Sequence, residues 1–278
     1  MTRKINFINP FGTTVYDGLI RETLLHYAMD GTEVDVTHLE GCPDDMDYFY
    51  PNHVVETALF EAVRKSEEQG YQAVISGCCY DPGVLTAREL DSIPVIDPMH
   101  ASIQKMGYFG RTAVIVTDHF RASTHMRDNI RLYGATDYIL GLDVIDWYVC
   151  DMIKDTDAVA QDVIDVSRKA VERTGAECVI LNCTIIAASY QRYLMNGGKP
   201  SEVPILNPNL MALMMAEPLA HLYQKGAYHI SRLEYYGQPK VQHFKGVTEQ
   251  TRAAWQAVTP DLAKALANPN YCIGSIQL

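Results

Sequence analysis

The chain of 278 residues carries the same order of predicted elements twice. In each half, short apolar runs rich in Val and Ile alternate with longer stretches whose apolar residues recur at helical spacing. The segment Pro94-Val95-Ile96-Asp97-Pro98 of the first half returns as Pro204-Ile205-Leu206-Asn207-Pro208 in the second. Because strands that alternate with helices form parallel sheets, this internal repeat predicts two similar α/β units.

The expected elements follow the same order in both halves. The first half has expected strands at residues 4–9, 32–39, 72–77 and 93–98, and expected helices at residues 16–29, at 53–69 and up to Leu90. The second half has expected strands at residues 112–117, 136–142, 178–182 and 203–207, and expected helices at 121–133, 157–174 and 185–195. We therefore predict an α/β fold with two pseudo-symmetric, Rossmann-like lobes, residues 1–100 and 101–209, each with a parallel four-stranded sheet flanked by helices.

The remaining residues, 210–278, extend beyond the repeat. A helix is expected over residues 209–224 and another near residues 249–266. We expect these C-terminal helices to pack back on the first lobe.

The position of the site follows from the sheets. Ligands of parallel α/β sheets bind beyond the carboxyl ends of the strands, so the cleft between the lobes is the predicted site. The residues expected at these strand ends are Asn9, Cys78, Asp97, Thr117, Cys183 and Asn207.

The composition excludes some classes of binding partner. Lys and Arg total 23 against 34 for Asp and Glu, a formal charge of −11, so the chain lacks the basic surface that nucleic acid or anionic lipid would need. The N-terminus has no apolar signal-peptide core and the chain has no run of about 18 apolar residues, which predicts a cytoplasmic protein without a membrane partner. An odd number of cysteines, seven, favours free thiols in a reducing compartment. A small-molecule substrate is expected.

Cys78 and Cys183 occupy matching places in the two halves. Each is expected to end a strand and open a helix, where unpaired backbone N–H groups lower the pKa of a thiol below about 8.5. Two such thiols facing each other across a cleft suit two-base proton transfer at a carbon α to a carbonyl: one thiolate removes a proton and the other thiol returns one. We expect Cys78 and Cys183 to be the catalytic residues.

Other residues are expected to bind substrate. The backbone N–H groups after each cysteine and the side chains of Asn9, Thr117 and Thr184 are candidate donors to an enolate oxygen, although all three side chains also suit capping of turns or helices. Tyr80 either lines the cleft or packs behind it. A metal site at the cysteines is not expected, because neighbouring cysteines are poor ligands for one tetrahedral ion and no Cys-x-x-Cys occurs.

At this point the residues resemble a known family. Cys78-Cys79-Tyr80-Asp81-Pro82-Gly83-Val84, followed by Ala87-Arg88-Glu89, resembles the Cys-aromatic-Asp/Tyr-Asp-Pro-Gly-Leu…Ala-Arg-Glu signature of the hydantoin racemase branch of the aspartate/glutamate racemase superfamily. Ile8-Asn9-Pro10-Phe11-Gly12-Thr13 resembles the Ile-Asn-Pro-Asn-Thr segment of that branch, and Cys183 falls where the family has its second catalytic cysteine. The likeness spans roughly residues 5–211.

The resemblance implies a racemase or epimerase that needs no cofactor and works with two cysteines in a pseudo-symmetric pair of lobes. It also implies a homo-oligomer and a small carbonyl substrate with an acidic C–H, such as a hydantoin-like or amino-acid-derived compound. Phe11 and Cys79, where the family usually has Asn and Phe, join the expected substrate-binding residues, and register with the Asp-Pro-Gly motif makes Cys78 rather than Cys79 the catalytic thiol.

Two alternatives remain at this stage. The same scaffold serves maleate-type cis–trans isomerases, for which cationic residues around the cleft are expected, and Arg88, Arg111 and Arg121 are the nearest candidates. A two-lobed chain could also be a non-catalytic protein that closes on a small molecule.

Overall fold

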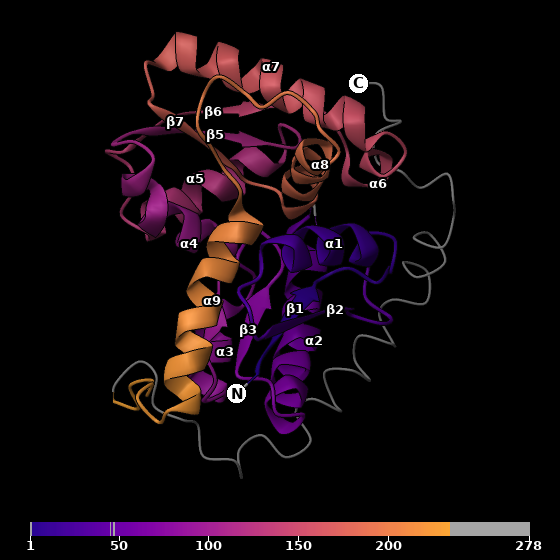
Figure 1. Ribbon diagram of the computed structural model, residues 1–278, viewed down its shortest axis with the longest axis vertical. Helices are drawn as coiled ribbons and strands as arrows, with labels where there is room; N and C mark the ends of the chain where they lie inside the picture. Colours follow the sequence, from indigo (N-terminus) through magenta and orange to yellow (C-terminus); the bar gives the residue numbers. More distant parts are fainter. Residues whose placement is uncertain (1, 45, 47, 234–278) are drawn as a thin grey trace.

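The computed structural model describes residues 2–44, 46 and 48–233. Figure 1 shows two lobes, one built around β1, β2 and β3 and the other around β5, β6 and β7. The first sheet contains β1 (Arg3–Asn9), β2 (Thr32–His38), β3 (Ala73–Ser76) and β4 (Val95–Ile96) in the order β2-β1-β3-β4. The second contains β5 (Ala113–Thr117), β6 (Ile139–Val144), β7 (Cys178–Leu181) and β8 (Ile205–Leu206) in the equivalent order β6-β5-β7-β8.

All neighbouring strands of both sheets are parallel, which confirms the predicted fold of two lobes with four-stranded parallel sheets. The described helices are α1 (Asp17–Tyr27), α2 (Phe49–Glu68), α3 (Val84–Leu90), α4 (Pro98–Lys105), α5 (Ala122–Leu132), α6 (Val149–Met152), α7 (Thr156–Thr174), α8 (Thr184–Met195) and α9 (Pro208–Gln224), with a 3₁₀ turn, η1 (Met106–Tyr108), after α4.

The cores lie on both faces of the central strands. Every residue of β3, β5 and β7 is buried, as parallel strands covered by helices on both faces require. β2 is an edge strand and has a single fully buried residue, Val34. Continuous apolar runs thus mark central strands of the two sheets.

Helix α9 carries the chain from the second lobe back to the first. It packs against β1, β3, β4 and α4, and Figure 1 shows it running beside β3. Its buried Glu217 accepts hydrogen bonds from the Met29 N–H and the Thr32 hydroxyl, both at 2.7 Å. The helix expected near residues 249–266 lies outside the described residues.

Helix α4 was not predicted from the sequence. Pro98 was placed at the end of a strand, and no helix was expected after it. Proline suits the first turn of a helix because the N–H groups there have no partner within the helix, so a residue without an N–H loses no hydrogen bond. Pro98 is the first residue of α4. The described part of the chain holds no helix that is both long and apolar enough to cross a bilayer.

Candidate active site

A small cavity lies between the lobes, at the carboxyl ends of the central strands. Its lining residues come from both lobes and are Phe11, Met46, Cys78, Cys79, Tyr80, Asp118, Met126, Val149, Asn182, Cys183 and Thr184. The cavity volume of about 20 Å³ holds roughly one water molecule. The space is therefore too narrow for a substrate, and lining residues must move apart before one binds.

Cys183 sits where the sequence predicts, at the N-cap of α8. The N–H groups of Ile185 and Ile186 donate to its sulfur, as expected at a helix N-terminus. Nevertheless burial, followed by the charge of Asp118, raises the pKa of the Cys183 thiol well above its usual value. The expectation of a lowered pKa is wrong for this residue in the closed site, because desolvation outweighs the helix amides.

Cys78 does not open a helix, in contrast to the prediction. It lies two residues beyond β3 in a turn, and α3 begins only at Val84. The Asp81-Pro82-Gly83 turn intervenes, with Asp81 and Gly83 both at positive φ, 51° and 62°. The Tyr80 N–H lies 3.4 Å from the Cys78 sulfur and donates to it.

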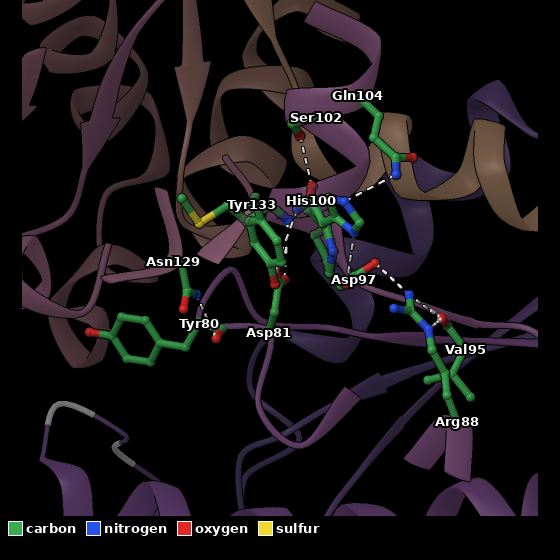
Figure 2. Close-up of polar contacts among 12 residues, drawn as sticks. Tyr80, Asp81, Arg88, Val95, Asp97, His100, Ser102, Gln104, Asn129 and Tyr133 are labelled. Carbon is green, nitrogen blue, oxygen red and sulfur yellow. Dashed lines mark hydrogen bonds and ion pairs between the residues drawn. The ribbon is translucent and has the colours of Figure 1, made fainter. Parts of the chain in front are cut away.

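The second lobe holds this turn in place. The Asn129 side-chain amide donates to the carbonyl oxygen of Tyr80 at 3.0 Å (Figure 2). His125 Nε2 lies 3.2 Å from the same oxygen. The rings of Tyr80 and His125 also pack together, with centroids 4.6 Å apart. Residues of α5 thus position the cysteine turn of the opposite lobe.

Thr184 links the two cysteine turns directly. Its hydroxyl donates to the carbonyl oxygen of Gly77 at 3.0 Å, and the Asn209 amide donates to the Thr184 carbonyl oxygen at 2.9 Å. Both threonine groups are buried. This contact joins the residue before Cys78 to the residue after Cys183.

The other expected binding residues divide into two groups. Phe11, Cys79 and Tyr80 line the cavity with Thr184, although Cys79 is 1% exposed and burial raises the pKa of its thiol well above the usual value. The structure does not bring Asn9 or Thr117 into the lining. The Asn9 amide donates to Asp17 at 3.0 Å, and the Thr117 hydroxyl lies within 3.1 Å of Asp118 Oδ1 and of the Asn182 carbonyl oxygen.

A buried polar network supports the Cys78 turn from behind (Figure 2). Asp81 accepts hydrogen bonds from the Tyr133 hydroxyl at 2.7 Å and from the N–H groups of Met99 and His100 at 3.2 Å, so it caps the start of α4. Burial, with the nearby charge of Asp97, raises the pKa of Asp81 well above its usual value. The turn, α4 and the end of α5 are thereby fastened to one carboxyl group.

The neighbouring carboxyl group is tied to a cation. Burial opposes ionisation of Asp97, but the His100 hydrogen bond and the Arg88 charge together lower its pKa. Arg88 lies 2.7 Å from Asp97 and also donates to the Val95 carbonyl oxygen. Arg88 is thus engaged in this network, outside the cavity lining, and is not placed to receive a substrate carboxylate.

Sequence reasoning missed several lining residues, of which Asp118 and Asn182 are polar. Each follows a central strand of the second sheet, β5 or β7, so the rule that strand ends form the site would have included them. Met46, Met126 and Val149 reach the cavity from loops and helices, and no local signal marks them. Among the described residues, no three His, Cys, Asp or Glu side chains gather as a metal site requires.

Comparison with known proteins identifies the class. Residues 5–216 match the family described as Asp/Glu/Hydantoin racemase. The chain therefore belongs to the Asp/Glu/hydantoin racemase family and is an isomerase of the racemase type.

Individual relatives agree with this assignment. The chain is 24% identical over 246 residues to a hydantoin racemase from Pseudomonas sp. (strain NS671), a match that covers 88% of this chain and 96% of that protein. A hydantoin racemase from Rhizobium meliloti is 24% identical over 242 residues, covering 87% and 97%. The fold is similar to that of an allantoin racemase from Klebsiella pneumoniae, with a TM-score of 0.75 and 24% identity over 86% of this chain and 94% of the other.

Proposed function

We propose that this protein is a cofactor-independent racemase or epimerase that acts at a carbon α to a carbonyl by two-cysteine proton transfer. The observation that carries the proposal is that Cys78 and Cys183, each two residues beyond its central strand, β3 or β7, line the same small cavity. The hydantoin racemases among its relatives support a hydantoin-like or amino-acid-derived substrate.

In this mechanism one thiolate removes the α-proton and leaves a planar enolate, and the thiol on the other face donates its own proton to the same carbon. The two sulfurs exchange protonation states in each turnover, so the pair carries one negative charge before and after the reaction, and the enolate carries that charge in between. The raised pKa of Cys183 suits the thiol state when Cys78 holds the charge. The Ile185 and Ile186 N–H groups stabilise the thiolate that remains after Cys183 has donated.

Closure of the cavity supports this chemistry in a second way. A site from which water is excluded strengthens the electrostatic interactions that stabilise the enolate, and prevents loss of the abstracted proton to solvent. Pre-positioned thiols on both faces of the substrate then avoid the entropic cost of bringing the groups together.

The test is proton NMR in D₂O with a panel of hydantoins, amino acids and maleate. Wild type is compared with Cys78→Ser and Cys183→Ser, and with Cys178→Ser as a control, because Cys178 lies at the far end of β7 and outside the cavity lining. We expect exchange of the α-proton with loss of optical rotation in wild type and in the control, and no racemisation in either cavity variant.

Two results would change the conclusion. If both cavity variants kept near-full turnover, the two-base mechanism would be wrong. Conversion of maleate without exchange at hydantoins or amino acids would favour the cis–trans isomerase alternative instead.

A further inference from the structure

The charged residue in the described lining of the cavity is acidic, which does not suit the carboxylate of an amino acid. The described lining contains an acidic side chain, Asp118, and no Lys, Arg or His. Asp118 is 5% exposed. Its Oδ1 accepts hydrogen bonds from the Thr117 hydroxyl at 3.0 Å and from the His119 N–H at 2.9 Å, which fix the carboxylate at the end of β5.

The charge of Asp118 acts on the reacting groups. After burial, it is the largest influence raising the pKa of Cys183, and it contributes in the same direction at Cys79. Inside a closed cavity such a charge is poorly screened by salt or water. Any ligand placed between the thiols therefore experiences the same negative field.

Asn182 provides a second, independent observation. Its side chain lines the cavity and is 1% exposed, and among the described residues its Oδ1 has no hydrogen-bond partner. A buried amide oxygen without a donor is unfavourable unless a ligand supplies one. The lining thus contains two side chains with acceptor oxygens, Asp118 and Asn182.

From these observations we infer that Asp118 selects the substrate by charge. With Asn182 it accepts hydrogen bonds from N–H groups of an uncharged amide or ureide, and its carboxylate repels compounds that carry a carboxylate on the reacting carbon. This inference rests on the proposed function and narrows its substrate to the neutral class. Within that function, Asp118 is a specificity-determining residue.

The first test uses two alkylating reagents of nearly equal size, neutral iodoacetamide and anionic iodoacetate. Fragment-ion mass spectrometry measures the rate at Cys78 and Cys183 separately, and the same cysteines in the urea-unfolded chain give the intrinsic ratio of the two rates. In wild type we expect the folded protein to favour iodoacetamide by about tenfold beyond the intrinsic ratio, as a fixed charge a few ångströms away predicts.

Three variants test whether the charge of Asp118 causes this preference for iodoacetamide. Asp118→Asn, which keeps the oxygen that Thr117 and His119 bind, should bring the ratio close to its intrinsic value, whereas Asp118→Glu should preserve the preference. Asp128→Asn makes the same change in net charge at an exposed residue of α5 that pairs with Arg131 at 2.8 Å, and should leave the ratio as in wild type.

A folded wild type without preference for the neutral reagent would overturn the inference, even if the Asp118 variants failed to fold. So would an equal preference in wild type and Asp118→Asn. Alkylation needs no turnover, so this result stands apart from the proposed function, which fails instead if wild type racemises nothing.

The second test pairs a 5-substituted hydantoin with the N-carbamoyl amino acid that forms from it by ring opening. These molecules share the reacting carbon, but only the second carries a carboxylate. We expect wild type to exchange the α-proton of the hydantoin much faster than that of the N-carbamoyl amino acid, and Asp118→Asn to lower the ratio of the two kcat/KM values by about tenfold. Preference for the anionic compound in wild type would contradict charge selection.

Discussion

The hydroxyl of Thr184 donates a hydrogen bond of 3.0 Å to the carbonyl oxygen of Gly77, across the boundary between the two lobes. Gly77 precedes Cys78 and Thr184 follows Cys183, so this one bond joins the two turns that bear the proposed bases. The separation of the thiols is thereby coupled to the closure of the lobes.

Removal of this bond should weaken both stability and activity. Thr184→Val keeps the shape of the side chain but leaves the buried Gly77 carbonyl oxygen without this donor, at a cost of about 1–3 kcal/mol in the free energy of unfolding. Because the thiols lose their fixed separation, we expect kcat to fall about tenfold. Urea unfolding and steady-state kinetics measure both effects, and Thr184→Ser, which keeps the hydroxyl, should stay close to wild type.

Gly77 itself has no room for a side chain. A methyl group added there would overlap the ring of Phe7 and the carbonyl oxygen of Ile8 in the neighbouring strand. We expect Gly77→Ala to lower the free energy of unfolding by about 1–3 kcal/mol and to displace Cys78. Gly107→Ala is the matched control, because an added methyl there meets no atom within 4 Å. Equal melting temperatures for the two variants would refute this account.

The pH dependence of Cys183 alkylation follows from its raised pKa. Only the thiolate reacts, so in the ligand-free protein the rate at pH 7 should be low and should climb about tenfold per pH unit into the alkaline range. In the urea-unfolded chain the same cysteine should level off near pH 8.5. A plateau below pH 8 in the folded protein would mean that the helix amides, not burial, control this thiol.

Tyr133 tests the network behind the Cys78 turn. Its hydroxyl donates to Asp81 and its ring stacks on His100, with centroids 4.3 Å apart. Tyr133→Phe keeps the stacking and removes the donor, so we expect a loss of about 1–2 kcal/mol in the free energy of unfolding. Tyr138→Phe, on a half-exposed ring, should change little. Chemical unfolding of both variants provides the comparison.

Asp91 gives a pH-dependent contribution to stability. Burial, and then the charge of Glu67, raise its pKa from 3.8 to about 7 in the folded chain. Between pH 3.8 and about pH 7 the folded chain therefore binds more protons than the unfolded chain. The stabilising contribution of protonated Asp91 is lost as the pH rises through this range. We expect Asp91→Asn to raise the free energy of unfolding by about 1 kcal/mol at pH 8.

The same substitution should give no gain at pH 4, where Asp91 is already protonated in the folded protein. Urea unfolding of wild type and Asp91→Asn at both pH values measures the difference. A gain of equal size at both would trace the effect to something other than ionisation.

The internal repeat predicted the architecture correctly, because strands and helices follow from the local spacing of apolar residues. Apolar runs mark the buried strands, and the helix that begins at Pro208 has its counterpart in α4 after Pro98, which the repeat itself could have indicated. Strands β4 and β8 are shorter than expected, since proline flanks them and cannot donate to a ladder.

The site was less accessible to sequence reasoning, because its properties arise between the lobes. Both candidate thiols were recognised, yet the pKa of Cys183 depends on burial and on Asp118, which no pattern in the sequence connects to it. Cys78 was expected to open a helix, but the Asp81-Pro82-Gly83 turn, with positive φ at Asp81 and Gly83, intervenes before α3 begins at Val84.

Helix α9 follows the second lobe in the sequence but packs on the first sheet, so folding of the first lobe depends on a segment that is synthesised after the second lobe. A fragment that ends at residue 207 would contain the eight strands of the described part of the chain. It would lack the helix that covers β1, β3 and β4 and the Glu217 carboxylate that binds Met29 and Thr32. The first lobe, although it is made first during synthesis, can complete its core only after the second lobe has been made. The first half of the repeat therefore lacks part of its core when it is produced alone, and fragment complementation would have to supply α9 together with residues 1–100.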